Sequence, residues 1–187
     1  MKSDAQLSEH VALDEEIIRR AKVDPAEFRP LYVKYFKNIY LFVLHRTASK
    51  EISSDITSQV FLKALTALEK YEFRGLPFSS WLYRIAINEC NSFFRKTRIS
   101  RTVVLDDEHA EKIYEEMFGD NTADELRRQL PYILQRLKPD ELQLIELRFL
   151  EARAFKEVAE ILNITETHAK TKTYRTLDKM KKLFLLK

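Results

Sequence analysis

The sequence predicts an all-α protein in which an acidic linker joins two small helical domains. Strong helix formers (Leu, Glu, Lys, Arg and Ala) dominate the 187 residues, and only two glycines occur among them. Apolar residues make up 45% of the chain, which is enough for packed cores. Charge is divided unevenly, because residues 103–125 carry nine acids and one lysine, whereas residues 163–187 carry seven Lys or Arg and two acids. We therefore expect one domain over 10–98, a linker over 99–123 with a short helical piece around 111–118, and a second domain over 124–187.

Cysteine usage and the N-terminus bear on where the protein works. Cys90 is the single cysteine, which excludes an internal disulfide and is typical of a reducing compartment. Residues 1–6 are polar and lack the apolar run of a signal peptide, and no apolar stretch is long enough to span a bilayer. The sequence thus predicts a cytoplasmic protein without membrane insertion. Cys90 falls on the apolar stripe of its helix and is expected to be a small core residue.

Four helices are expected in the first domain. Their approximate ranges are 14–22, 25–43, 56–68 and 81–98, with a loop at 71–77. Asp24 followed by Pro25 is a helix-start signal. Polar residues within 53–55 and within 79–80 are the expected N-caps of the third and fourth helices.

The end of the chain has the pattern of a helix-turn-helix. Apolar spacing predicts a short helix over 155–162, and Asn163 suits a tight connection because asparagine tolerates left-handed backbone. Thr165 is a natural N-cap for the helix that follows. Ala159 is small at the place where the two helices would cross closely. Two amphipathic helices, beginning near 124 and at 139, precede this motif.

The last helix has two unlike faces, one of them apolar. The other face mixes cations, hydroxyls and an aromatic ring, and it contains Thr167, Lys170, Thr171, Tyr174 and Arg175. Such cations reach phosphates or guanine edges, and the hydroxyls make further base contacts. The pattern favours DNA binding over its plain alternative, a helical hairpin with a basic solvated face.

Three stretches, taken in order, resemble the sigma-70 family of transcription initiation factors. The core-polymerase-binding helix of that family is similar to residues 54–64 (SDITSQVFLKA). Its promoter-reading helix is similar to residues 78–91 (FSSWLYRIAINECN) with the basic pair at 95–96. Its second DNA-binding domain is similar to residues 147–182. The resemblance covers about 15–183 and is closest to the extracytoplasmic-function (ECF) group.

The resemblance implies a role for each part of the chain. A region 2-like domain would bind core RNA polymerase and the −10 promoter element, and a region 4-like helix-turn-helix domain would bind the −35 element. The implied polymerase contacts are Asp55, Ser58, Gln59 and Lys63. The implied −10 contacts are Phe73, Arg74, Arg84, Asn88, Asn91, Arg95 and Lys96. The implied −35 contacts are Arg148, Thr167, Lys170, Thr171, Tyr174 and Arg175.

The −10 assignment has a physical basis. A base that leaves the duplex needs a polar partner for its pairing edge and apolar or aromatic walls for its ring, and Phe73, Arg74 and Asn88 would supply them. Trp81 is expected to pack in the core instead of stacking on a base.

The acidic linker would, by resemblance, pass through the polymerase and mimic a phosphate chain there.

No catalytic set emerges from the sequence. None of the four histidines has a second His or Cys at metal-ligand spacing, and the acidic run at 106–108 is typical of a solvated loop. We therefore expect a protein that is not an enzyme and that needs neither a metal nor a cofactor.

The predicted partners are bacterial core RNA polymerase, promoter DNA (the −35 duplex and the melted −10 strand) and, by resemblance, an anti-sigma factor. A stand-alone helix-turn-helix transcriptional regulator is the first alternative. It would need a dimer interface or a ligand-sensing domain, but the sequence has no long heptad seam and the first domain has no obvious ligand site. A helical protein-interaction module with incidental basic charge is the second.

Overall fold

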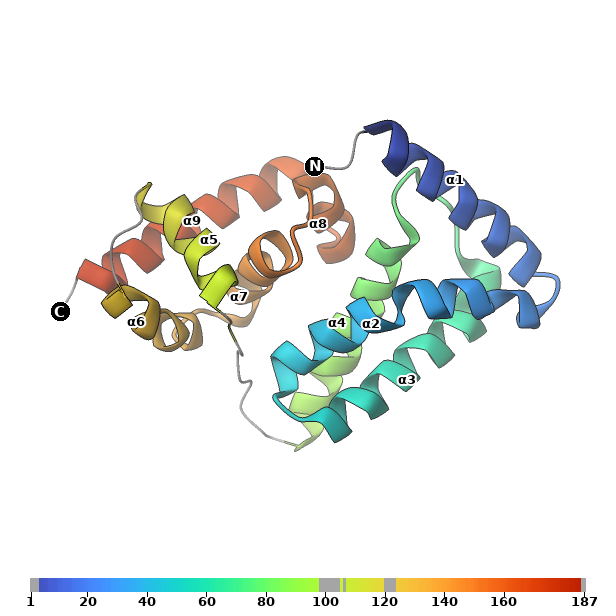
Figure 1. Ribbon diagram of the computed structural model, residues 1–187, viewed down its shortest axis with the longest axis horizontal. Helices are drawn as coiled ribbons and strands as arrows, with labels where there is room; N and C mark the ends of the chain where they lie inside the picture. Colours follow the sequence, from blue (N-terminus) through green and yellow to red (C-terminus); the bar gives the residue numbers. More distant parts are fainter. Residues whose placement is uncertain (1–3, 98–104, 106, 120–123, 186–187) are drawn as a thin grey trace. The chain divides into compact units, whose positions relative to one another are not determined.

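The computed structural model describes residues 4–97, 105, 107–119 and 124–185, and these form helices and connections without a strand (Figure 1). The chain divides into two compact units, Met1–Ser100 and Arg101–Lys187. The predicted all-α fold is confirmed over the described residues. In this part of the chain no helix combines the length and the apolar character needed to cross a membrane.

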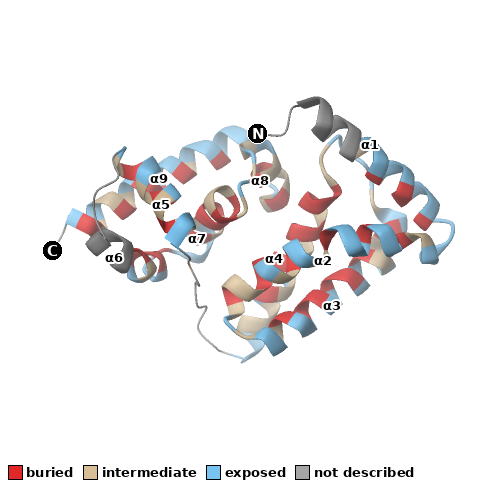
Figure 2. Ribbon diagram, in the orientation of Figure 1, coloured by how far each residue is buried: buried red, intermediate tan, exposed pale blue. Residues whose placement is uncertain are grey.

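The first unit packs its helices around an aromatic-rich core. Its elements are α1 (Asp4–Ala21), η1 (Pro25–Phe28), α2 (Arg29–Thr47), α3 (Lys50–Ala67), η2 (Leu68–Lys70) and α4 (Phe78–Thr97). Helices α2, α3 and α4 pack on one another, and α1 contacts α2 and α4. The buried faces of these helices point inward (Figure 2). Fully buried core residues are Leu31, Ile39, Val43, Val60, Ala64, Leu82, Tyr83, Ala86 and Cys90, so the prediction for Cys90 is confirmed.

The helix starts in this unit correct several predictions. Helix α3 begins at Lys50 with Ser49 as N-cap, whose Oγ accepts a hydrogen bond from the Ile52 amide at 3.4 Å. The predicted caps within 53–55 are wrong, because Ala48 adopts left-handed backbone (φ 54°) and ends α2 directly before this point. Ser53 instead lies buried inside α3, where its hydroxyl donates to the Ser49 carbonyl at 2.6 Å.

Three other starts also differ. Helix α1 begins at Asp4, ten residues before the predicted start. Asp24 does act as a cap, since its Oδ1 accepts from the Ala26 amide at 2.9 Å, but it opens the short η1, and α2 follows from Arg29. Helix α4 begins at Phe78, so residues 79–80 lie buried within its first turn and are not its caps.

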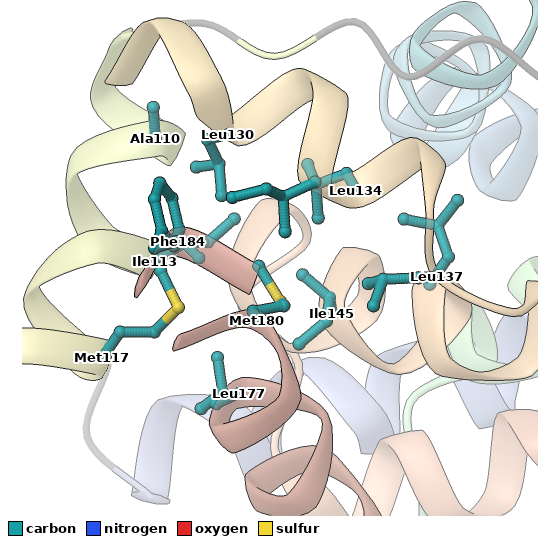
Figure 3. Close-up of a cluster of buried hydrophobic side chains, with 12 residues drawn as sticks. Ala110, Ile113, Met117, Leu130, Leu134, Leu137, Ile145, Leu177, Met180 and Phe184 are labelled. Carbon is teal, nitrogen blue, oxygen red and sulfur yellow. The ribbon is translucent and has the colours of Figure 1, made fainter. Parts of the chain in front are cut away.

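The second unit is a separate helical core. Its elements are α5 (Asp107–Phe118), α6 (Asp124–Gln135), α7 (Pro139–Ile145), the π-helical η3 (Glu146–Leu150), α8 (Phe155–Leu162) and α9 (Glu166–Leu185). A buried cluster joins α5, α6, α7 and α9 (Figure 3). It consists of Ala110, Ile113, Met117, Leu130, Ile133, Leu134, Leu137, Leu142, Ile145, Leu177, Met180 and Phe184.

Helix α5 shortens the expected linker. Ala110, Ile113 and Met117 point from α5 into the buried cluster, and the exposed fraction of Ile113 is 0% (Figure 3). These side chains repeat at spacings of three and four, which places them on one face of the helix. The short helical piece expected around 111–118 is thus part of α5, and residues 107–118 of the expected linker contribute to the core of the second unit.

Two ion pairs connect α7 with α9. The Lys172 ammonium donates to the Asp140 carboxylate, and the Lys179 ammonium donates to Glu141 Oε2 at 2.6 Å. Glu141 also accepts a hydrogen bond from the backbone amide of Lys138 at 2.8 Å. Both carboxylates lie in the first turn of α7, where the helix dipole favours negative charge.

We expect the second unit to lose stability in acid through these two carboxylates. The hydrogen bond from Lys172 holds the pKa of Asp140 below its ordinary value. Burial raises the pKa of Glu141, but hydrogen bonds from Lys179 and the Lys138 amide outweigh burial, so that the net pKa is also lowered. A carboxylate with a lowered pKa in the fold stabilises it above the ordinary pKa of about 4, and this contribution disappears as pH falls through the folded-state pKa.

The free energy of unfolding in urea, detected by hydrogen exchange of the α7 and α9 amides, measures this effect from about pH 6 to about pH 3. The Asp140→Asn, Glu141→Gln double variant should lose less stability over that range than the parent chain. Equal losses in the two proteins would show that the ion pairs contribute nothing.

Candidate nucleic-acid and polymerase interfaces

The four predicted polymerase contacts share the exposed side of α3. Asp55, Ser58, Gln59 and Lys63 are all solvent-exposed, at spacings of three or four that place them along one strip of the helix. Because Ser49 caps α3, the Asp55 carboxylate has no capping task in this fold. The Ser58 hydroxyl donates to the Ser54 carbonyl at 2.9 Å, whereas Lys63 reaches across to α4.

Lys63 joins the two helices that the resemblance assigns to different partners. Its ammonium lies 2.6 Å from Glu89 Oε1, next to the predicted base contact Asn88. The Lys63 side chain is 53% exposed and that of Glu89 is 18% exposed, so solvent screens the pair. The ion pair adds one polar contact to the packed interface between α3 and α4.

A double-mutant cycle measures this pair. We expect Lys63→Ala and Glu89→Ala to show a coupling of about 0.5 kcal/mol in urea unfolding of the first unit, a size typical of a partly exposed ion pair. Lys37→Ala, at an exposed lysine of α2, serves as the matched control and should not couple to Glu89→Ala. Strictly additive effects of Lys63→Ala and Glu89→Ala would mean that Lys63 is not held by Glu89 in solution.

The predicted −10 contacts lie on the loop before α4 and along α4 itself. Phe73 is 38% exposed, and Arg74 is exposed beside it. Gly75 has a φ of +68°, which favours glycine, and nothing lies within 4 Å of the place where a Cβ would stand. The loop therefore presents an aromatic ring and a cation at a sharp turn of the chain.

Helix α4 continues this set with a polar face. Asn88, Asn91 and Arg95 are exposed and follow one another at spacings of three and four, and Lys96 is exposed beside them. Arg84 differs from the rest, because its side chain is only half-exposed. The structure thus brings Asn88, Asn91 and Arg95 onto one face and leaves Arg84 partly inside the fold.

An aromatic cluster supports the loop. The half-buried Trp81 ring packs against Tyr71 at 4.8 Å and against Phe78 at 5.4 Å between centroids, so it contacts the core but is not among its buried residues. The ammonium of Lys22, at the end of α1, donates to the Tyr71 carbonyl at 2.7 Å. No local sequence pattern indicates this role for Lys22, since its partner lies 49 positions away.

The helix-turn-helix has the predicted geometry. Asn163 adopts left-handed backbone (φ 55°, ψ 49°) between α8 and α9, and Thr165 Oγ1 accepts from the His168 amide at 3.2 Å. Ala159 is buried where α8 packs on α9. The five polar residues predicted on α9 are all exposed, namely Thr167, Lys170, Thr171, Tyr174 and Arg175.

Arg148 lies apart from this exposed group, within η3. Its Nη1 donates to the Arg153 carbonyl at 3.1 Å, and its guanidinium lies 5.1 Å from the centre of the Phe155 ring. Phe155 in turn contacts Tyr174 of α9. Arg148 is half-buried and stabilises the turn that leads into α8.

Sequence reasoning missed a surface hollow of about 440 Å³ beside Arg148. Its lining residues are Lys112, Glu115, Glu116, Arg148, Phe149 and Ala152. Among the described residues, no group of three or more His, Cys, Asp or Glu side chains is arranged to hold a metal ion.

Comparison with known protein families gives two matches. Residues 31–99 match Sigma-70 region 2, and residues 133–182 match Sigma-70, region 4. The first match covers α2, α3 and α4, and the second covers the helix-turn-helix. Together they span more than half of the chain, in the order that the resemblance required.

Three relatives are named as extracytoplasmic-function factors. The chain is 28% identical to the ECF RNA polymerase sigma factor BldN of Streptomyces coelicolor, over 90% of this chain and 64% of BldN. It is 22% identical to the ECF RNA polymerase sigma factor SigM of Bacillus subtilis, over 82% of this chain and 93% of SigM. It is 27% identical to the ECF RNA polymerase sigma-E factor of Escherichia coli K12, over 87% of this chain and 89% of that factor.

Solved structures share the fold. One is that of CnrH in complex with the cytosolic domain of CnrY, with a TM-score of 0.61 and 18% identity over 91% of this chain and 96% of that chain. Another is that of the sigma factor RpoE in complex with the anti-sigma factor NepR from Bartonella quintana, with a TM-score of 0.60 and 16% identity over 86% of this chain and 98% of that chain. Since region 2 and region 4 both match in order, and the relatives are ECF factors, this chain belongs to the extracytoplasmic-function group of the sigma-70 family of RNA polymerase sigma factors.

Proposed function

We propose that this chain binds bacterial core RNA polymerase and directs it to promoters, where it recognises the −35 duplex and holds melted −10 bases. One observation carries the proposal: the same chain exposes a region 2-type polar strip on α3 and α4 and a region 4-type recognition face on α9. Its mechanism is binding in the cytoplasm, without catalysis of its own.

The recognition face of α9 suits the major groove of a duplex. Lys170 and Arg175 carry positive charge toward phosphates or guanine edges, and Thr171 and Tyr174 offer hydroxyls between them. The N-terminal part of the second helix in a helix-turn-helix is the part that enters the groove, and these residues occupy that part of α9.

The loop and α4 suit a single strand. Opening the duplex and extruding a base costs roughly a few kcal/mol, and a pocket that receives the base offsets that cost. Asn88 would contact a pairing edge, Phe73 would contact a base ring, and Arg74, Arg95 and Lys96 would contact phosphates. Arg84 would contribute only with the part of its guanidinium that is exposed.

The strip on α3 is the proposed polymerase contact. Asp55, Ser58 and Gln59 supply its polar groups, and Lys63 contributes its charge while paired with Glu89. An anti-sigma factor that covers this strip would keep the protein from polymerase. The sigma factor RpoE, which shares this fold, was solved in complex with the anti-sigma factor NepR. The connection between the units would run through the polymerase, with α5 remaining part of the second unit.

A stand-alone helix-turn-helix regulator is the less favoured reading. Such a protein would require only the second unit to resemble a DNA-binding family. The match of residues 31–99 to Sigma-70 region 2 leaves that reading without a role for the first unit.

Asn88→Ala tests whether α4 contacts the melted −10 strand while α3 contacts polymerase. We expect it to lower open-complex formation about fivefold, the size of one lost polar contact, while polymerase binding stays unchanged. Permanganate footprinting of the melted bases and fluorescence anisotropy with core polymerase measure the two effects. Asn38→Ala, at an exposed asparagine of α2, is the matched control and should resemble the parent. If both readouts fell together, Asn88 would be structural.

A further inference from the structure

The C-terminal end of α1 is fixed firmly against the rest of the first unit. Asp14 is buried and accepts hydrogen bonds from the Tyr35 hydroxyl and, at 2.5 Å, from the Lys34 ammonium. One turn later, Ile17 and Ile18 are buried as well. Lys22 is exposed and directly follows α1, so its side chain extends from an anchored helix end.

Lys22 connects this anchored end to the loop that carries the predicted −10 contacts. Its ammonium donates to the Tyr71 carbonyl at 2.7 Å, where the chain leaves η2 and enters the loop (Figure 1). A hydrogen bond from a charged donor is stronger than one between neutral groups. The first residue of the loop is thus held through its main chain from outside the loop.

Aromatic rings provide a second connection to the same place. Tyr71 packs edge-on against Phe78, with 5.3 Å between the ring centroids. Phe28 of η1 also packs edge-on against Phe78, with 6.3 Å between the centroids. Phe78 and Phe28 are buried. The segment from α1 to η1 therefore contacts the two ends of the loop, through the hydrogen bond from Lys22 and through edge-to-face rings.

The loop beyond Tyr71 is exposed, and it is the part that a melted strand would meet. Residues 72–75 are solvent-exposed, and Gly75 has left-handed backbone. Ordering such a segment when a ligand binds costs conformational entropy, and ordering it beforehand improves affinity. An anchor at the start of the loop lowers that cost.

We infer that α1 and η1 brace the loop at 72–77, with Lys22 as the positioning residue, so that the melted −10 strand meets a preformed loop. The inference rests on the proposed function. It assigns a task to residues 4–28, which lie before the match to Sigma-70 region 2 begins at residue 31.

Two measurements on the full chain test the brace. Lys22→Met removes the donor and keeps the length of the side chain, Lys22→Arg restores a donor, and Lys37→Met is the matched control on α2. Hydrogen exchange of the loop amides 72–76 should become faster in Lys22→Met alone. In reconstituted holoenzyme, Lys22→Met should lower open-complex formation about fivefold on a promoter mapped with the parent chain, with unchanged polymerase affinity, and Lys22→Arg should recover most of the loss.

Three outcomes would overturn the inference. Loop exchange that is the same in Lys22→Met and the parent would show that Lys22 does not brace the loop. Faster exchange with undiminished open complexes would show that the brace does not serve DNA binding. Failure of Lys22→Arg to recover the loss would assign the effect to something other than a donated hydrogen bond. Failure of the parent chain to open any promoter would instead contradict the proposed function, and the exchange result would still decide whether the brace exists.

Discussion

Arg175→Ala is expected to weaken binding of the −35 duplex by about 1–3 kcal/mol, which is about fivefold to 150-fold in the dissociation constant. Arg175 is exposed on the face of α9 that also presents Lys170, Thr171 and Tyr174. A guanidinium that contacts a guanine edge in two places contributes both affinity and sequence preference. The loss should therefore be larger for the mapped promoter sequence than for a scrambled duplex.

Anisotropy titrations of holoenzyme on these two duplexes, at fixed salt, measure the difference. Lys182→Ala is the matched control, since Lys182 is an exposed cation farther along the same helix. An equal loss of affinity on both duplexes would make Arg175 a phosphate contact. A shallower salt dependence of binding in Arg175→Ala than in the parent would lead to the same conclusion. Unchanged affinity on both would remove Arg175 from the recognition face.

Ile113→Ala is expected to destabilise the second unit by about 2–5 kcal/mol, which is the usual cost of truncating a fully buried aliphatic side chain. Ile113 is 0% exposed and lies in the cluster that α5 forms with α6, α7 and α9. The truncation also leaves a cavity. Unless neighbouring side chains fill it, the cavity increases the loss of stability beyond the transfer free energy of the removed atoms. Helix α5 should therefore behave as part of the domain.

Hydrogen exchange of α6 and α9 amides measures the stability of the second unit directly. Trp81 is the only tryptophan in the chain and lies in the first unit, so its fluorescence follows that unit and should be unchanged. Lys112→Ala, at the neighbouring exposed position, is the matched control. A cost below about 0.5 kcal/mol for Ile113→Ala, the range of a surface substitution, would place α5 outside the core.

Local signals in the sequence were sufficient for the helix-turn-helix. Asn163 supplies the left-handed turn and Thr165 the cap, and both act within a few residues of their own position. The exposed face of α9 follows from helical periodicity alone. The same periodicity located Asn88 and Cys90 on opposite sides of α4, one exposed and one buried.

The predictions that failed depended on distant partners or on unusual backbone. The apolar repeat of α5 stands among many acids, and the surface that buries it comes from α6 and α9. Ser49 was overlooked as a cap because the left-handed residue before it is alanine, where glycine is usual. The pairs Lys63–Glu89 and Lys22–Tyr71 depend on how helices pack against their neighbours, which local sequence patterns do not reveal.

Co-purification of the chain with bacterial core RNA polymerase, followed by transcription from a genomic fragment library, tests the central claim most directly. We expect a stoichiometric complex and discrete new start sites with shared sequences upstream, near −10 and −35. A chain that bound duplex DNA by itself and left core polymerase unbound would contradict the sigma-factor function and would favour a stand-alone regulator.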